Sequence, residues 1–278
     1  MTTMTYITLN STLYAVHQAG IGAPVLILHG FTGDGASFIG NLPHLINNYR
    51  LIAPDLLGHG ITESPQDPAR YRIENAVADL ASLLDYLKIT SCPVLGYSMG
   101  GRLALALAIF HPERVSKLIL ESSSAGLELA QERLARITSD ESLAERIITG
   151  GIESFVAEWE NLPLWKTQSP ALREKLRENR LKNNPLGLAN SLRGMGTGAQ
   201  PSFWDKLGAL AMPTLLITGA EDDKFTRIAH QMGEKIPDVR IETIPNAGHT
   251  VHLEAPEAYQ HIVADFLGYN QHNNVLQS

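Results

Sequence analysis

The segment Gly96-Tyr97-Ser98-Met99-Gly100 limits the folds open to this chain more than any other. A short apolar run, Pro93 to Leu95, precedes it and is typical of a buried strand, whereas the run from Leu103 to Ala108 is typical of a helix. The two glycines let strand and helix approach each other around a sharp turn, which would hold the Ser98 hydroxyl out of the sheet. We therefore predict a nucleophile elbow with Ser98 at its apex.

Short apolar runs, each followed by turn residues, recur along the chain and alternate with segments of helical spacing. We expect strands at residues 25–28, 51–53, 93–97, 118–120, 214–218 and 239–244, one or two antiparallel edge strands within residues 7–19, and helices at residues 73–87 and 256–267. This alternation predicts an α/β fold with a mostly parallel central sheet covered by helices on both faces. In such a sheet, ligands bind at the carboxyl ends of the strands.

One long segment, residues 123–206, interrupts the alternation, because it has helical patterns and no convincing strand. We expect it to form a helical cap inserted into an α/β core that comprises residues 1–122 and 207–278. Since the insertion follows the strand at residues 118–120, it should lie over the carboxyl end of the sheet.

A serine hydroxyl becomes reactive when a histidine takes its proton and an acid orients that histidine. Asp222 follows the predicted strand at residues 214–218, and His249 follows the next strand. The order Ser98, Asp222, His249 is that of the α/β-hydrolase architecture. The neighbouring Asp223 stays an alternative acid, and Asp222 has an alternative role as the N-cap of the helix that follows it.

Two backbone N–H groups are expected to form the oxyanion hole, that of Met99 after the nucleophile and that of Phe31 after an early strand. Other histidines are assigned no part in the triad. His252 is expected at the surface or behind the site. His29 and His59 come too early in the chain and are expected to be hydrogen-bonded turn residues.

Composition excludes several functions. The net charge of −7 argues against a nucleic-acid-binding surface. Cys92 is the sole cysteine, so no internal disulfide can form, and we expect it to fill the core of a protein in a reducing compartment. No phosphate-binding loop, dinucleotide fingerprint or zinc motif is present, so we expect neither cofactor nor metal. No apolar run reaches membrane-spanning length and Met1–Tyr6 lacks the shape of a signal peptide, so we expect a soluble cytoplasmic protein.

Several motifs together resemble the 2-succinyl-6-hydroxy-2,4-cyclohexadiene-1-carboxylate (SHCHC) synthases. The elbow and its following arginine read G-Y-S-M-G-G-R, which ends at Arg102. The other matching segments are Glu121–Leu127, Gln131–Arg136, Arg180–Pro185, Met195–Pro201, Gly219–Phe225 and Asn246–His249. The elbow and the Gly-His pair are shared by all α/β-hydrolases, whereas Arg102, the Gly-Leu…Arg pattern that ends at Arg136 and the Gly-Thr-Gly-x-Gln-Pro run are more specific. The likeness extends over about residues 25–267.

This family eliminates pyruvate from 2-succinyl-5-enolpyruvyl-6-hydroxy-3-cyclohexene-1-carboxylate and so forms SHCHC. The resemblance implies that the chain is a carbon–oxygen lyase of menaquinone or phylloquinone biosynthesis. It implies that Ser98, assisted by Asp222 and His249, acts as a base on a ring carbon. Phe31 and Met99 would then stabilise the negative charge that develops on the succinyl carbonyl.

The substrate of this family carries three carboxylates, which planar guanidinium groups bind bidentately. The resemblance implies that five side chains hold this small anionic substrate or line its site: Arg102, Arg136, Arg180, Tyr97 and Trp159. The three arginines would bind the carboxylates. Arg133 shares a helix face with Arg136 and stays an alternative ligand.

Two other functions are compatible with the same fold. A carboxylesterase or carbon–carbon-bond hydrolase would use the same triad with water as the second reactant, and fold alone does not separate it from a lyase. The arginines discriminate, because a neutral ester requires none of them. A binding module without catalysis is disfavoured, because binding does not demand an intact Ser98, Asp222 and His249.

Overall fold

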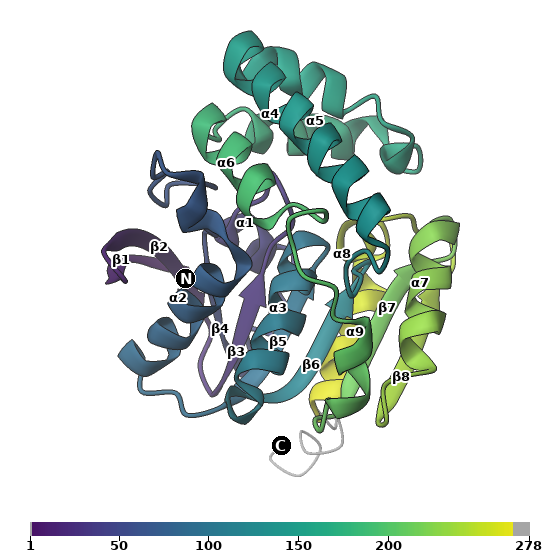
Figure 1. The fold of residues 1–278 in the computed structure, drawn as a ribbon. Helices are drawn as coiled ribbons and strands as arrows, with labels where there is room; N and C mark the ends of the chain where they lie inside the picture. The colour runs from purple at the N-terminus through teal and green to yellow at the C-terminus, as the bar shows by residue number, and fades with distance from the viewer. Residues whose placement is uncertain (1, 269–278) are drawn as a thin grey trace.

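An eight-stranded sheet forms the centre of this computed structural model, which describes residues 2–268 (Figure 1). The last ten residues of the predicted core segment 207–278 lie outside that range. The strands are β1 (Thr3–Leu9), β2 (Thr12–Ala19), β3 (Ala23–Leu28), β4 (Tyr49–Pro54), β5 (Cys92–Tyr97), β6 (Val115–Glu121), β7 (Thr214–Gly219) and β8 (Val239–Ile244). The α-helices are α1 (Gly35–Gly40), α2 (Ile73–Tyr86), α3 (Met99–Phe110), α4 (Ala130–Trp159), α5 (Pro170–Arg180), α6 (Pro185–Met195), α7 (Asp223–Gly233), α8 (Val251–Glu254) and α9 (Pro256–Leu267). Short 3₁₀ helices are η1 (Pro68–Tyr71), η2 (Pro112–Arg114), η3 (Pro163–Trp165) and η4 (Trp204–Ala209).

The strand order is β1-β2-β4-β3-β5-β6-β7-β8. β2 pairs antiparallel with both β1 and β4, and every other pair is parallel. β5 lies at the centre, where Leu95 is in register with Ile27 of β3 and Ile119 of β6. The predicted α/β-hydrolase fold with its mostly parallel sheet is confirmed, and the expected edge strands are β1 and β2.

Side chains alternate between the two faces of the sheet, as the pleat of a strand dictates. Leu26 and Leu28 point into one apolar core, which α2, α3 and α7 cover, whereas Val25 and Ile27 point into the other, which α1 and α9 cover. All four side chains are fully buried. Such doubly covered strands explain why the sequence shows continuous apolar runs rather than an alternating pattern. Cys92, at the start of β5, is buried in the first core, as predicted.

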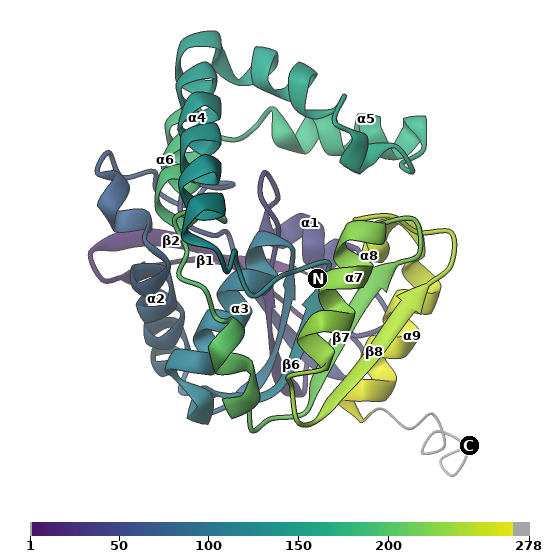
Figure 2. The same cartoon turned by 45° about the vertical axis from the view of Figure 1, so that its right-hand side comes forward.

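Between β6 and β7, the helices α4, α5 and α6 lie together above the carboxyl ends of the parallel strands (Figures 1 and 2). α4 and α6 share a small core that includes Ile147, Val156 and Leu188. α4 changes direction at Gly151, whose φ of 77° and ψ of 174° lie outside the helical region. These helices therefore lie over the carboxyl-terminal edge of the sheet, which is also the edge that carries Ser98.

Among the described residues, no helix has both the length and the hydropathy that crossing a bilayer requires.

Candidate active site

Ser98 lies at the sharp turn between β5 and α3. Its φ of 51° and ψ of −106° place a non-glycine residue in a strained backbone conformation, at a cost of about 1–3 kcal/mol. A Cβ on Gly100 would overlap the carbonyl of Leu28, and one on Gly96 would overlap the backbone of Gly100. The elbow thus requires both glycines. It leaves the Ser98 hydroxyl beside the first N–H groups of α3, which have no partner within the helix.

The three residues predicted as a triad are joined by hydrogen bonds. Ser98 Oγ lies 3.1 Å from His249 Nε2, and His249 Nδ1 lies 2.7 Å from Asp222 Oδ2. His249 and Asp222 are buried. The other oxygen of Asp222 accepts the backbone N–H of Phe225 at 3.2 Å, so this residue orients the histidine and also caps α7. Asp223 is exposed in the first turn of that helix and makes neither contact.

A cavity of about 240 Å³ opens in front of Ser98 and His249. The predicted oxyanion-hole residues Phe31 and Met99 line it. From the helices above the sheet, Arg136 and Trp159 reach it. The indole N–H of Trp159 is buried without a hydrogen-bond partner among the described residues.

Two of the predicted arginines share this cavity. Arg102 is held by hydrogen bonds of 2.7 Å to the carbonyl oxygen of Met195 and to Oε1 of Gln200. Burial, together with the nearby charge of Arg136, lowers the pKa of Arg102 to about 10. Arg136 pairs with Asp140 at 2.7 Å, and its side chain is 41% exposed. A ligand carboxylate would relieve the repulsion between the two guanidinium groups.

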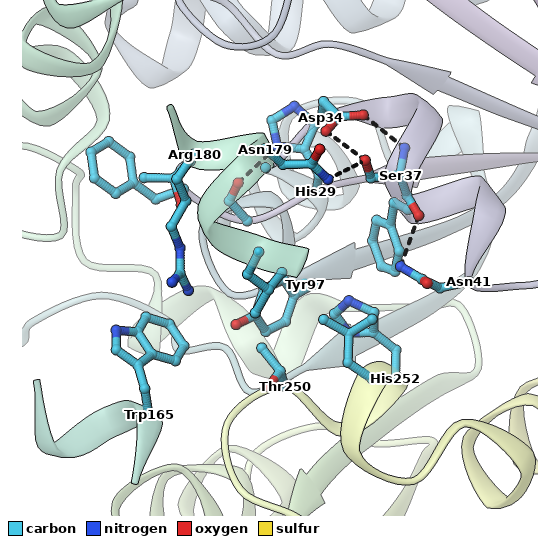
Figure 3. A pocket seen from close by; sticks show the side chains of 17 residues that line it. His29, Asp34, Ser37, Asn41, Tyr97, Trp165, Asn179, Arg180, Thr250 and His252 are labelled. Carbon is cyan, nitrogen blue, oxygen red and sulfur yellow. Dashed lines mark hydrogen bonds between the residues drawn. The ribbon is translucent and has the colours of Figure 1, made fainter. Parts of the chain in front are cut away.

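The third arginine, Arg180, lies in a second cavity of about 70 Å³ (Figure 3). Tyr97, Trp165 and Phe31 line both cavities, so the two adjoin. The Arg180 guanidinium stacks 5.3 Å from the centre of the Trp165 ring. The side chain is 5% exposed, and its contact with Glu160 is long, at 3.4 Å. Burial lowers the pKa of Arg180 below its usual value.

The alternative ligand Arg133 lines neither cavity. It donates hydrogen bonds to the backbone carbonyls of Leu127 and Glu128 and so fastens the start of α4. Although Arg133 and Arg136 lie on one helix face, only Arg136 reaches the larger cavity.

Comparison with known proteins adds to this geometry. The family described as "alpha/beta hydrolase fold" matches residues 23–256. A "Putative 2-succinyl-6-hydroxy-2,4-cyclohexadiene-1-carboxylate synthase" of Bacillus subtilis (strain 168) is 46% identical over 259 residues, which are 91% of this chain and 94% of that protein. The chain belongs to the SHCHC synthase family. The synthase of Enterobacter sp. (strain 638) is 31% identical over 88% of this chain and 92% of its own. The solved "Structure of MenH from S. aureus" superposes with a TM-score of 0.86 at 34% identity, and the match covers 91% of this chain and 97% of that one.

Of the two places expected for His252, the surface and behind the site, the structure shows the second: His252 is buried and pairs with Glu121, which is 131 positions away. Two residues at the site were missed by the sequence analysis, namely Gln200, which holds Arg102, and Trp165, which stacks on Arg180. Gln200 lies in the Gly-Thr-Gly-x-Gln-Pro run, so that motif was the available signal for it.

The two early histidines have the structural role predicted for them. His29 Nδ1 lies 2.8 Å from the carbonyl of Gly30, and its Nε2 accepts the N–H of Leu56. His59 Nδ1 lies 3.1 Å from the carbonyl of Leu57. His29 thus fixes the loop that carries Phe31.

Proposed function

We propose that this chain eliminates pyruvate from 2-succinyl-5-enolpyruvyl-6-hydroxy-3-cyclohexene-1-carboxylate and forms SHCHC in menaquinone or phylloquinone biosynthesis. The observation that carries the proposal is that three arginines lie close to the triad. Arg102 and Arg136 line the same cavity as Ser98 and His249, and Arg180 lines the adjoining cavity. A neutral ester would bring no counter-charge to Arg102, whose hydrogen-bond partners Met195 and Gln200 are uncharged, or to Arg180, whose contact with Glu160 is long. The three carboxylates of one small substrate would supply that charge. The names of the synthase relatives support the same reaction.

Ser98 acts as a base in the proposed mechanism. His249 takes the hydroxyl proton of Ser98 at 3.1 Å while the serine oxygen removes a proton from a ring carbon. The electron pair of the broken C–H bond forms a new ring double bond, the existing ring double bond shifts by one position, and the C–O bond to the enolpyruvyl oxygen breaks. The enolpyruvate takes the proton that His249 holds and tautomerises to pyruvate, so no water is consumed and the triad returns to its starting state. Asp222 stabilises the imidazolium that His249 becomes.

The remaining groups stabilise charge that the reaction moves or that the substrate brings. The backbone N–H groups of Phe31 and Met99 would receive the enolate oxygen of the succinyl carbonyl. Arg102 and Arg136 would bind carboxylates in the larger cavity and Arg180 one in the smaller.

Trp159 and Tyr97 would form walls of the site. We propose that residues 123–206 act as a cap, because they supply Arg136, Trp159 and Arg180 from above the sheet. We also propose a cytoplasmic location, since the buried free thiol of Cys92 fits a reducing compartment.

The experiment that tests the proposal follows pyruvate release with a coupled lactate dehydrogenase assay. The purified chain receives the enolpyruvyl cyclohexene substrate, and a parallel reaction receives an activated acyl ester. We expect fast pyruvate release, poor ester turnover, and loss of pyruvate release in Ser98→Ala. Ester turnover with no pyruvate above background would make the chain a hydrolase and would remove the carboxylate roles of the arginines.

A further inference from the structure

A second buried histidine–carboxylate pair lies behind the site. Glu121, the last residue of β6, is fully buried, and His252 belongs to α8. Glu121 Oε1 accepts the backbone N–H of His252 at 3.0 Å, and the two carboxylate oxygens lie 2.8 and 3.0 Å from His252 Nδ1. Among the described residues, no hydrogen bond or ring contact joins His252 to Ser98 or His249. The pair therefore stands outside the proton transfer that we propose for the triad.

Tyr97 lies between the two histidines. Its ring centre is 4.8 Å from that of His252 and 5.5 Å from that of His249. The Tyr97 ring also packs closely against Gly30, because a Cβ added to Gly30 would lie only 2.5 Å from Cε1 of the ring. Figure 3 shows Tyr97 with His252 on one side and with Arg180 and Trp165 on the other. Packing thus fixes the Tyr97 ring.

The hydroxyl of Tyr97 is open to a ligand. The residue is 9% exposed and lines both cavities, and within residues 2–268 its hydroxyl makes no hydrogen bond. Because Arg180 lines the smaller of these cavities on the same side of Tyr97, we expect one ligand to contact both the tyrosine hydroxyl and the Arg180 guanidinium (Figure 3). An anionic carboxylate has an oxygen for each of the two donors.

We propose that His252, anchored by Glu121, is a positioning residue that holds Tyr97 in place to bind a substrate carboxylate together with Arg180. The double anchor, through the backbone N–H and Nδ1, fixes the plane of the His252 ring, and that ring fixes Tyr97. A binding group held within a fraction of an ångström keeps its affinity, whereas a loosened one loses much of it. The inference rests on the proposed function, because it assigns the partner of Tyr97 to the substrate.

His252→Asn is the variant that tests this proposal. The amide nitrogen of asparagine can take the place of Nδ1 and donate to Glu121, while the ring atoms that face Tyr97 are removed. The substitution is made in the wild-type chain and in Tyr97→Phe, and kcat and KM for pyruvate release are measured for all four proteins. His261→Asn, an exposed position on α9, is the matched control. Thermal unfolding shows whether each variant folds.

We expect His252→Asn and Tyr97→Phe each to raise KM about 10-fold with little change in kcat, which is the order of one lost hydrogen bond to a charged group. The double variant should have the KM of Tyr97→Phe alone, because His252 acts through the tyrosine hydroxyl. His261→Asn should leave both constants unchanged. If His252→Asn does not fold, Glu121→Gln, which keeps an oxygen acceptor, replaces it. It is compared in the same way in the wild-type and Tyr97→Phe backgrounds, and the expected increase in KM is smaller.

Three results would overturn the proposal. The first is an equal KM increase from His252→Asn in both backgrounds, which would make its effect independent of Tyr97. The second is an unchanged KM in Tyr97→Phe. The third is a fall in kcat to the level of Ser98→Ala, which would place His252 in the chemical step. Absence of pyruvate release from the wild-type chain is a separate outcome: it refutes the proposed function, and the role of His252 falls with it.

Discussion

Asp222 is the position at which catalysis and stability can be separated most clearly. One carboxylate oxygen lies 2.7 Å from His249 Nδ1, and the other accepts the N–H of Phe225 at the start of α7. Asparagine caps a helix about as well as aspartate does, so the second role survives an exchange to asparagine. The first role does not, because an amide carries no charge. We predict that Asp222→Asn keeps the stability of the wild-type chain and loses most of its activity.

The size of the loss follows from what the carboxylate does for His249. Without it, the imidazole can take the wrong tautomer, and the imidazolium formed when Ser98 gives up its proton has no counter-charge. His249 is 2% exposed, so water cannot replace the missing anion. The corresponding substitution in Ser-His-Asp proteases lowers kcat by about 10⁴. We expect a loss of about 10³ to 10⁴ here, or about 4–5 kcal/mol in activation free energy.

Two further variants complete this test. Asp223→Asn, in the exposed first turn of α7, should change kcat less than about twofold, because it touches neither His249 nor the cap. Asp222→Ala should lose activity like Asp222→Asn and in addition about 1 kcal/mol of stability, because the cap is removed. Pyruvate release and thermal unfolding measure the two effects. An Asp222→Asn enzyme that retains more than a tenth of the wild-type kcat would refute the orienting role of this carboxylate.

Two other predictions follow from burial and charge. Arg136→Met should lower kcat/KM for pyruvate release by a factor of about 10–100, whereas Arg133→Met, outside both cavities, should change it less than about twofold; equal effects would reject Arg136 as the carboxylate ligand. Acid should destabilise the fold through His59, because burial lowers its pKa to about 3 and the unfolded chain, at 6.5, binds the proton first as the pH falls. Between pH 7 and 4.5 the wild-type chain should lose about 3 kcal/mol of its free energy of unfolding through this residue, and His59→Asn should not lose it. Urea unfolding of both proteins at the two pH values measures the effect. If the difference in free energy of unfolding between them were the same at both pH values, His59 would not be buried in its neutral form.

The sequence was sufficient to predict that Ser98 and His249 come together with an acid from residues 222–223, because triad chemistry constrains both the order of these residues and the residues that flank them. A serine between two glycines after an apolar run fits an elbow, and an acid and a histidine after later strands reach the same edge of a parallel sheet. The structure was needed to choose between Asp222 and Asp223. The two residues are adjacent in the chain, yet only the Asp222 side chain faces His249, whereas Asp223 is the first residue of α7 and is exposed to solvent.

His252 shows how far reasoning from the sequence reaches. Three residues after His249, it was expected at the surface or behind the site, and the sequence does not decide between the two. The short helix α8 places it behind the site, against Tyr97, where it meets Glu121 from β6. Nothing in the sequence near His252 points to a partner 131 positions earlier. The separation of Arg180 into its own cavity was equally hidden, since it depends on how α5 and η3 pack Arg180 against Trp165.

Arg102 connects the core of the molecule with the segment above the sheet, and the proposed function gives it a substrate carboxylate to bind. Arg102 belongs to α3, the helix that follows Ser98, so the core fixes the position of its backbone relative to Ser98. Its orientation, however, comes from Met195 and Gln200 in the segment above the sheet. If Arg102 binds a substrate carboxylate as we propose, it can do so in this orientation only while that segment is docked on the core. The triad alone would serve ester hydrolysis equally well. We therefore propose that the lyase reaction is selected by a core arginine that Met195 and Gln200 orient from above the sheet.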